Sequence, residues 1–138
     1  NGRKIMAITD TSSHPIAIHV ESASPSEITL VEATLAQRFT QKTPQNLIGD
    51  KAYDSDPHDV RLRETHHINL IAPHKTNRVK PRTQDGRSLR KYKRRWIVER
   101  FNAWIQNYRR IVVRWEYKIE NYVGFVHLGC MLILLRLI

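Results

Sequence analysis

The apolar residues of this chain fall into short segments whose order limits the folds it can adopt. Apolar-rich segments at 4–9 and 15–20 predict two strands, and the polar residues between them predict a turn, so that residues 3–20 form a hairpin. The elements that follow are a helix from Ser24, a strand at 46–50, a helix from Asp56 and a strand at 68–72. A hairpin followed by strands that alternate with helices predicts a mixed α/β sheet with helices packed on its faces.

The C-terminal half is predicted to be helical after a basic connecting segment. Residues 74–87 lack a periodic apolar pattern and contain proline and glycine, which predicts a mobile basic loop. One long helix is expected over 88–113, because apolar residues recur there at steps of three and four. They are Ile97, Phe101, Trp104, Ile105, Tyr108, Ile111 and Val112. The apolar segment 121–138 is short for a bilayer, and we expect it to be a core helix and not a membrane span.

The charge of the chain indicates a polyanionic partner. The formal net charge is +10 over 138 residues, and 13 of the 23 Lys and Arg residues lie between Lys75 and Arg110. This clustering favours nucleic acid or an anionic membrane surface over a basic protein that is merely soluble. A single cysteine, Cys130, excludes a disulfide framework and a thiol-rich metal site, and it favours a reducing compartment. Because the chain begins without Met and stops within an apolar run, we expect it to be a piece of a longer protein.

Two carboxylates are the candidates for chemistry. Asp50 ends a short predicted strand, at the edge of the sheet where ligands of open α/β sheets usually bind. Glu99 lies on the predicted long helix, opposite the middle of its apolar stripe and among arginines and lysines. Converging carboxylates would hold Mg²⁺, and a pair of such ions promotes phosphodiester cleavage. Two alternatives stay open: a helix-capping or turn role for Asp50, and a buried structural salt bridge between Arg95 and Glu99.

Three segments together resemble the catalytic domain of a bacterial insertion-sequence DDE transposase: Leu47–Ser55, Ala72–Arg78 and Arg94–Trp104. The resemblance covers nearly the whole chain. It implies an RNase H-like mixed sheet with flanking helices, in which two Asp and one Glu bind two divalent metal ions, Mg²⁺ or Mn²⁺. Enzymes of this family nick transposon ends and join the freed 3′-hydroxyl to target DNA. The resemblance further implies a bacterial cytoplasmic protein whose partner is DNA, and it leaves a homodimer of the full-length protein open.

Carried onto this sequence, the resemblance assigns two catalytic, metal-binding carboxylates. Asp50 matches the second catalytic Asp, and Glu99 matches the catalytic Glu. Tyr92, Arg95 and Glu99 match the family spacing of Tyr, two residues, Arg, three residues, Glu, which disfavours an RNase H-like nuclease or resolvase as the alternative enzyme. Gln106 stands where the family has Lys, so we expect one contact to a terminal phosphate to be weaker. The residues expected to contact DNA are Tyr92, Arg94, Arg95, Arg100, Gln106, Lys75 and Arg78.

The first catalytic Asp is the difficult assignment. Asp10 lies in an Asp-Thr-Ser stretch that resembles the family's first strand, but residues 5–20 resemble the family's second and third strands. We therefore expect the first strand and its Asp to lie before Asn1, and the chain alone to bind metal poorly and to cleave nothing. A non-catalytic basic DNA-binding module and a decayed transposase remnant are the alternative functions.

Two acidic and two aromatic residues lie in or near these motifs. Asp54 and Asp56 are expected to cap the helix that follows them and not to bind metal. Trp104 is expected to pack in the core, whereas for Trp96 both core packing and stacking on flipped bases stay open.

Overall fold

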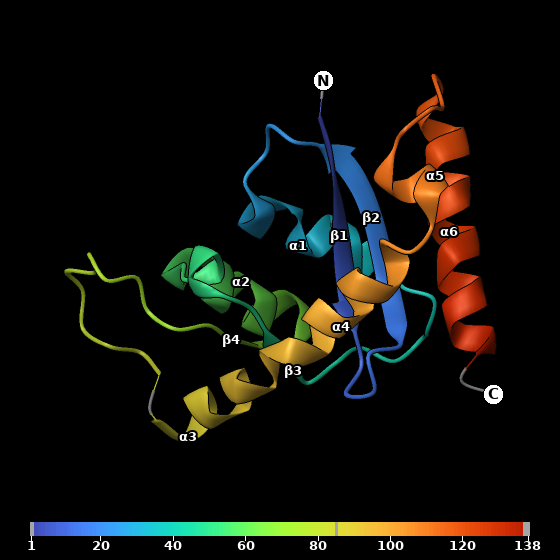
Figure 1. Cartoon of the computed structure of the whole chain (residues 1–138). Coiled ribbons are helices and arrows are strands. Elements are labelled where there is room, and N and C mark those ends of the chain that lie inside the picture. The colour runs from blue at the N-terminus through green and yellow to red at the C-terminus, as the bar shows by residue number, and fades with distance from the viewer. Residues whose placement is uncertain (1, 85, 137–138) are drawn as a thin grey trace.

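The strands form two separate two-stranded sheets (Figure 1). The computed structural model describes residues 2–84 and 86–136. In it, β1 (Arg3–Thr9) pairs antiparallel with β2 (Pro15–Ser22), so the segment predicted as a hairpin is one. β3 (Asn46–Ile48) pairs parallel with β4 (Asn69–Ile71). The helices described below complete a mixed α/β fold, as the order of segments predicts.

The β1–β2 hairpin lies at the centre of the fold because both of its faces are covered. Successive side chains of a strand point to opposite faces, and the neighbours Ala17 and Ile18 accordingly enter different cores. Ile18 packs with buried residues of the C-terminal helices: Phe101, Ile105, Ile111, Tyr122, Val126, Cys130 and Ile133. Ala17 packs with Ile8 and with buried residues of the segments that follow the hairpin, up to and including β4: Val31, Leu35, Leu62, Ile68 and Leu70.

Short helices connect the strands of the N-terminal half. The helix expected from Ser24 begins as the 3-10 helix η1 (Glu27–Leu30) and continues as α1 (Val31–Ala36), which contacts both strands of the hairpin. A second 3-10 helix, η2 (Lys51–Tyr53), leads from β3 into α2 (Asp56–His66). Because parallel strands cannot be joined by a tight turn, α2 carries the chain from the end of β3 to the start of β4.

The single long helix predicted over 88–113 is interrupted in the structure. It consists of three consecutive segments and a separate fourth: α3 (Gly86–Leu89), η3 (Arg90–Arg95), α4 (Trp96–Ile105) and α5 (Arg109–Val112). The interruption falls at Tyr108, whose backbone is extended (φ −92°, ψ 105°). The apolar spacing of three and four residues continues across this break, because residues on both sides of it face one core. Spacing alone therefore could not reveal the break.

The turn before α5 allows Ile111 to pack against the last helix, α6 (Ile119–Leu135). The contact is close at Gly129: a Cβ atom at that position would lie 2.7 Å from Ile111 Cδ1, so this methyl group would have to shift. α6 runs beside β2 (Figure 1) and begins two residues before the predicted 121–138 segment, whose last two residues lie outside the described part of the chain. Among the described residues, no helix combines the length and apolar character needed to span a membrane.

The two sheets differ in which strand edges are covered. The outer edge of β2 is covered at Ala17, which forms an isolated antiparallel bridge with Arg38. The outer edge of β4 is covered by the Gln84 side chain, which accepts from the Ala72 amide at 3.2 Å and donates to the Leu70 carbonyl at 3.4 Å. Within the described part of the chain, no main-chain hydrogen bonds occupy the second edge of β1 or of β3. In Figure 1, β1 lies on the side of its hairpin that faces β3, so these two open edges are the inner ones.

Candidate active site

Asp50 follows β3 and begins the 3-10 helix η2. Its Oδ1 accepts a hydrogen bond from the Ala52 amide at 2.8 Å, so the capping role left open for this residue is real. Gly49, just before it, is needed for the tight path of the chain, because a Cβ atom there would lie 2.8 Å from the Tyr53 ring. The Tyr53 hydroxyl bonds to Glu27 at 3.1 Å, and burial and then the Glu27 charge raise the pKa of this phenol. The loop that carries Asp50 is thus fixed at two points, while the second carboxylate oxygen of Asp50 has no bonding partner among the described residues.

Glu99 ends a bonded row of three side chains on the helix surface. Arg95 Nη1 donates to the Tyr92 hydroxyl at 2.8 Å, and Arg95 Nε donates to Glu99 Oε1 at 2.8 Å. The bond to Tyr92, followed by the bond to Glu99, raises the pKa of the Arg95 guanidinium. Both members of the ion pair are about half exposed, at 47% for Arg95 and 54% for Glu99, so the alternative of a buried structural salt bridge is wrong.

The 3-10 helix that precedes Glu99 and the strand that leads to Asp50 are neighbours. β3 contacts η3, the segment that supplies Tyr92 and Arg95 and continues directly into α4. Within residues 2–84 and 86–136, no three His, Cys, Asp or Glu residues gather as the ligands of a metal ion. Carboxylate oxygens are the ligands that Mg²⁺ prefers, so Asp50 and Glu99 fit such an ion in kind, and a complete site needs at least one further ligand.

The basic residues expected to contact DNA differ in how far their charges are already engaged. Lys75, Arg94 and Gln106 are exposed side chains. Arg100 instead joins α4 to the turn of the hairpin: its Nε donates to Ser13 Oγ at 2.8 Å, and its guanidinium carbon lies 4.8 Å and 5.2 Å from the ring centroids of Trp96 and Trp104. The two tryptophans therefore share a packed arginine.

Ser13 is a buried residue that the sequence analysis did not identify. Its backbone is left-handed (φ 68°), and its hydroxyl donates to the Ile97 carbonyl at 2.8 Å while it accepts from Arg100. Nothing in the polar stretch 10–14 distinguishes this serine from its neighbours, because its partners lie 84 and 87 residues away.

Asp10 is engaged within its own turn. Its Oδ1 accepts from the Ser12 amide at 2.8 Å and from the His14 amide at 2.9 Å, and its Oδ2 lies 3.3 Å from His14 Nδ1. Both carboxylate oxygens thus have local partners, as is usual for an aspartate that stabilises a tight turn.

Asp54 does not cap α2, contrary to the prediction. The residue preceding the helix is Ser55, and Asp54 is buried, at 8% exposure, where it binds three groups of the basic loop. They are His74 Nδ1 at 2.9 Å, the Lys75 amide at 2.7 Å and Arg78 Nη1 at 3.2 Å. Burial alone would raise the pKa of this carboxyl, but the bonds from Lys75 and His74 and the charge of Arg78 outweigh it and lower the pKa.

Comparison with known proteins identifies the family to which this chain belongs. The sequence profile of the Transposase DDE domain family matches residues 1–135, and the chain belongs to this family. It is 32% identical, over 140 residues, to a Burkholderia cepacia protein assigned as the transposase for insertion sequence element IS402. It is 37% identical, over 93 residues, to a Brucella ovis protein assigned as the transposase for insertion sequence element IS6501.

The extent of these matches differs between this chain and its relatives. The Burkholderia match covers 96% of this chain and 62% of the relative, so the chain spans less than two thirds of that protein's length. The Brucella match covers 66% of this chain and 68% of the relative. No solved structure matches the chain.

Proposed function

We propose that this chain is part of a transposase that cleaves DNA at transposon ends and transfers the freed 3′-hydroxyl to target DNA. Asp50 and Glu99 are two of its metal-binding carboxylates. Membership of the Transposase DDE domain family supports this proposal, and so does the net charge of +10, which suits a DNA partner.

The bonded row Tyr92–Arg95–Glu99 is the observation that carries the proposal. Spacings of three and four residues place these side chains on one helical face, and Arg95 bonds to both neighbours at 2.8 Å. A surface ion pair of this kind adds little to stability, so its value lies in orienting Glu99. Arg95 occupies Oε1, and no described residue bonds to Oε2, which leaves that oxygen available as a ligand.

The open inner edges of β1 and β3 support a further part of the proposal. A strand placed between them converts the two sheets into one five-stranded mixed sheet, as an RNase H-like fold requires. A carboxylate on that strand is the third ligand. Asp10 is a poor substitute, because both of its oxygens are engaged in the hairpin turn.

The chain's own side chains have distinct roles in this scheme. When bound, a pair of Mg²⁺ ions would supply an activated nucleophile and would stabilise the leaving oxygen of the phosphodiester. Asp50 and Glu99 would hold the pair through carboxylate oxygens, and Tyr92 and Arg95 keep Glu99 in place. The exposed Arg94 forms charge-assisted hydrogen bonds to DNA phosphates.

The test is cleavage of transposon-end DNA by the full-length protein with Mg²⁺ or Mn²⁺. Asp50→Asn and Glu99→Gln should each lower the rate by at least about a hundredfold, because losing even an outer-shell partner of a metal site costs about 10–100-fold. Asp10→Asn is the matched control and should retain cleavage. The chain of 138 residues alone should cleave nothing.

Three results would contradict the proposal. Full cleavage by either the Asp50 or the Glu99 variant removes that residue from the site. Metal-dependent nicking by the chain alone that is lost in Asp10→Ala makes Asp10 the missing ligand. DNA binding that is unchanged in EDTA, combined with no cleavage by the full-length protein, leaves a non-catalytic DNA-binding module.

A further inference from the structure

Residues 74–84 form a loop without helix or strand that is nonetheless tied down along its length. Its first residues bind Asp54 through His74 Nδ1 and the Lys75 amide. In its middle, Arg78 Nη2 lies 2.9 Å from both carboxylate oxygens of Asp56, and Arg78 Nη1 bonds to Asp54. At its end, the Gln84 side chain bonds to the outer edge of β4. The loop is therefore ordered by contacts at its start, its middle and its end.

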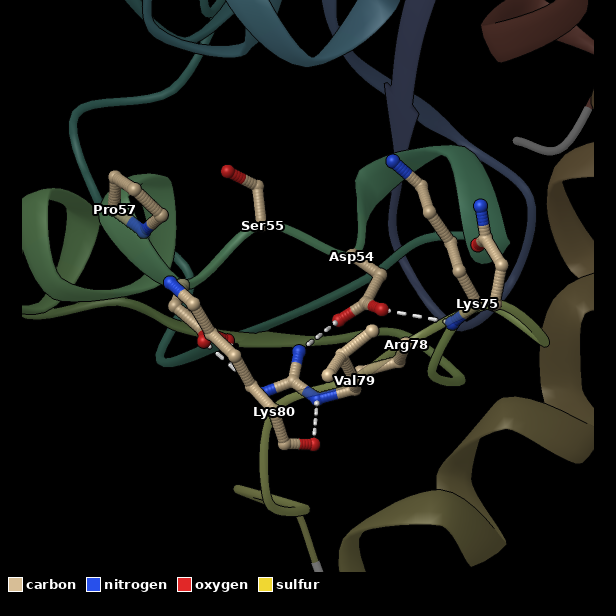
Figure 2. A pocket seen from close by; sticks show the side chains of 9 residues that line it. Asp54, Ser55, Pro57, Lys75, Arg78, Val79 and Lys80 are labelled. Atoms are coloured by element: carbon tan, nitrogen blue, oxygen red, sulfur yellow. Dashed lines mark hydrogen bonds and ion pairs between the residues drawn. The ribbon is translucent and has the colours of Figure 1, made fainter.

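Hydrogen bonds inside the loop complete this arrangement. Arg78 also donates to the carbonyls of Lys80 and Pro81, at 2.9–3.2 Å, so one guanidinium joins the loop backbone to the two aspartates. The Thr83 amide donates to His74 Nε2 at 3.2 Å, which places the ring hydrogen on Nδ1, facing Asp54. Figure 2 shows the Asp54 carboxylate directed at both the Arg78 guanidinium and the Lys75 amide. An open hollow beside it is lined by residues of 54–57 and of 75–80.

The charges of this loop divide into two groups. Arg78 is largely but not fully buried, with its side chain 11% exposed, and it is neutralised by Asp54 and Asp56. Lys75, Lys80 and Arg82 are exposed, and Val79 between them is 98% exposed. In Figure 1 the loop projects from the body of the molecule beside α2. The loop thus presents three cations, with one buried arginine as its internal brace.

We propose that residues 74–84 form a preorganised DNA-binding finger, held by Asp54 and Arg78, in which Lys75, Lys80 and Arg82 bind backbone phosphates of the DNA strand beside Asp50. This inference rests on the proposed function for the location of the DNA. The contacts of Arg78 with Asp54 and Asp56, together with those of Asp54 with His74 and Lys75, form a clasp that holds the finger. Because Asp54 lies only four residues after Asp50, this clasp fixes the finger relative to the proposed catalytic carboxylate. Arg78, expected from the sequence to contact DNA, acts as a positioning residue through the finger and not on a phosphate itself.

Preorganisation is what the clasp contributes to binding. A flexible basic loop loses conformational entropy when it binds DNA, and this loss weakens binding. A finger that is already fixed avoids part of this cost. Loosening the clasp should therefore weaken DNA binding even when the change makes the protein more positive.

Asp54→Asn provides a test in which simple electrostatics and the proposal predict opposite changes in DNA-binding affinity. The substitution removes one negative charge, so charge alone predicts tighter DNA binding. The proposal predicts binding weaker by on the order of tenfold, because Asn cannot accept from His74, Lys75 and Arg78 together as a carboxylate does. Glu64→Gln is the matched control: it removes the same charge from an exposed position of α2 and should leave binding unchanged or slightly tighter.

The salt dependence of DNA binding distinguishes a residue that holds the loop in place, such as Arg78, from one that contacts a phosphate directly. Each phosphate contact contributes about 0.9 to the slope of log K against log salt. Lys80→Ala and Arg82→Ala, both surface changes, should each lower the slope by about that amount. Arg78→Lys keeps the charge but has too few donors to bond to both aspartates and to the loop carbonyls, and it should lower the slope by the contribution of more than one contact.

Fluorescence anisotropy with labelled duplex DNA in EDTA measures these effects on the folded 138-residue chain, with circular dichroism to confirm folding. Because this assay needs no metal and no cleavage, its result is independent of the catalytic test above. Any of three results would overturn the proposal of a DNA-binding finger. They are tighter binding by Asp54→Asn, unchanged slopes for Lys80→Ala and Arg82→Ala, and a near wild-type slope for Arg78→Lys. Absence of DNA binding by the wild-type chain would overturn it as well.

Discussion

Two arginine–carboxylate assemblies in this molecule have similar geometry and opposite surroundings. Arg95 and Glu99 lie 2.8 Å apart on the helix surface, and each is about half exposed. Arg78 lies 3.2 Å from Asp54 and 2.9 Å from Asp56, with its side chain 11% exposed and that of Asp54 only 3% exposed. Distance alone does not distinguish the two, whereas exposure to solvent does.

The difference determines what each assembly can do. An exposed pair is screened by water and contributes little to folding, so Glu99 is free to exchange Arg95 for another cation. A buried pair that loses one partner leaves an uncompensated charge inside the protein, so Asp54 is committed to its partners. The exposed pair suits a site that must bind something, and the buried one suits a structural clasp.

The largest effect expected from this comparison is that of Arg78→Ala. It leaves Asp54 buried without its cation, and we expect the free energy of unfolding to fall by about 3–5 kcal/mol. Urea unfolding followed by circular dichroism measures the loss. A change below about 1 kcal/mol would mean that solvent reaches Asp54 and that the two assemblies are alike.

The buried hydroxyl of Ser13 also holds an arginine, Arg100, but it does so without a negative charge. Ser13→Ala removes the group that joins Ile97 to Arg100, and we expect a loss of about 1–3 kcal/mol. Ser13→Gly loses the same hydroxyl but tolerates the left-handed backbone at φ 68°, so it should be the more stable of the two variants. Thermal unfolding of both decides the order, and a less stable glycine variant would count against the role given to the backbone.

Asp59 tests the electrostatics beside the clasp through its pH dependence. Burial, and then the charges of Asp56 and Asp54, raise the pKa of Asp59 to about 6. The folded state therefore binds this proton more tightly than the unfolded state, so stability is lost as the pH rises from about 4 to above 6. Asp59→Asn removes this loss, and after allowance for solvent screening we expect a gain of about 1 kcal/mol, or about 3–5 °C in Tm, at pH 7.

The control for the Asp59 prediction is the same measurement at pH 4. There the wild-type carboxyl is largely protonated in the folded state, so the Asn variant should show no advantage. An equal gain at both pH values would point to the buried Oδ1 of Asp59, which has no bonding partner among the described residues, and not to its charge.

The smallest effect is expected for Arg95→Ala. Because the pair with Glu99 is exposed, the Tm should change by no more than about 2 °C. Cleavage by the full-length protein should fall nonetheless, since Glu99 loses the residue that orients it. A large drop in Tm would remove the distinction between the two assemblies.

The sequence was sufficient for the parts of the fold that depend on local pattern. The hairpin, the strand before Asp50 and the helix that carries Glu99 follow from apolar spacing and from polar turns. The break at Tyr108 did not follow, because the apolar period continues through it: Ile105 before the break and Ile111 after it pack into the same core.

The candidate site was predictable to a similar extent. The spacing of Tyr92, Arg95 and Glu99 placed them on one face, where two direct hydrogen bonds now link them. The partners of Asp54 lie 20 to 24 residues away across α2 and β4, and no helical or strand periodicity relates positions at that distance. Its burial, and the buried state of Arg78, therefore became visible only in three dimensions.

The open edges of β1 and β3 have a consequence for handling the isolated chain. Each presents a row of unsatisfied amides and carbonyls that will pair with any extended peptide, including the same edge of another copy. Pairing of these edges between copies favours association at high concentration, so the isolated chain is best kept dilute. Co-expression with a peptide that occupies this slot should keep it dispersed.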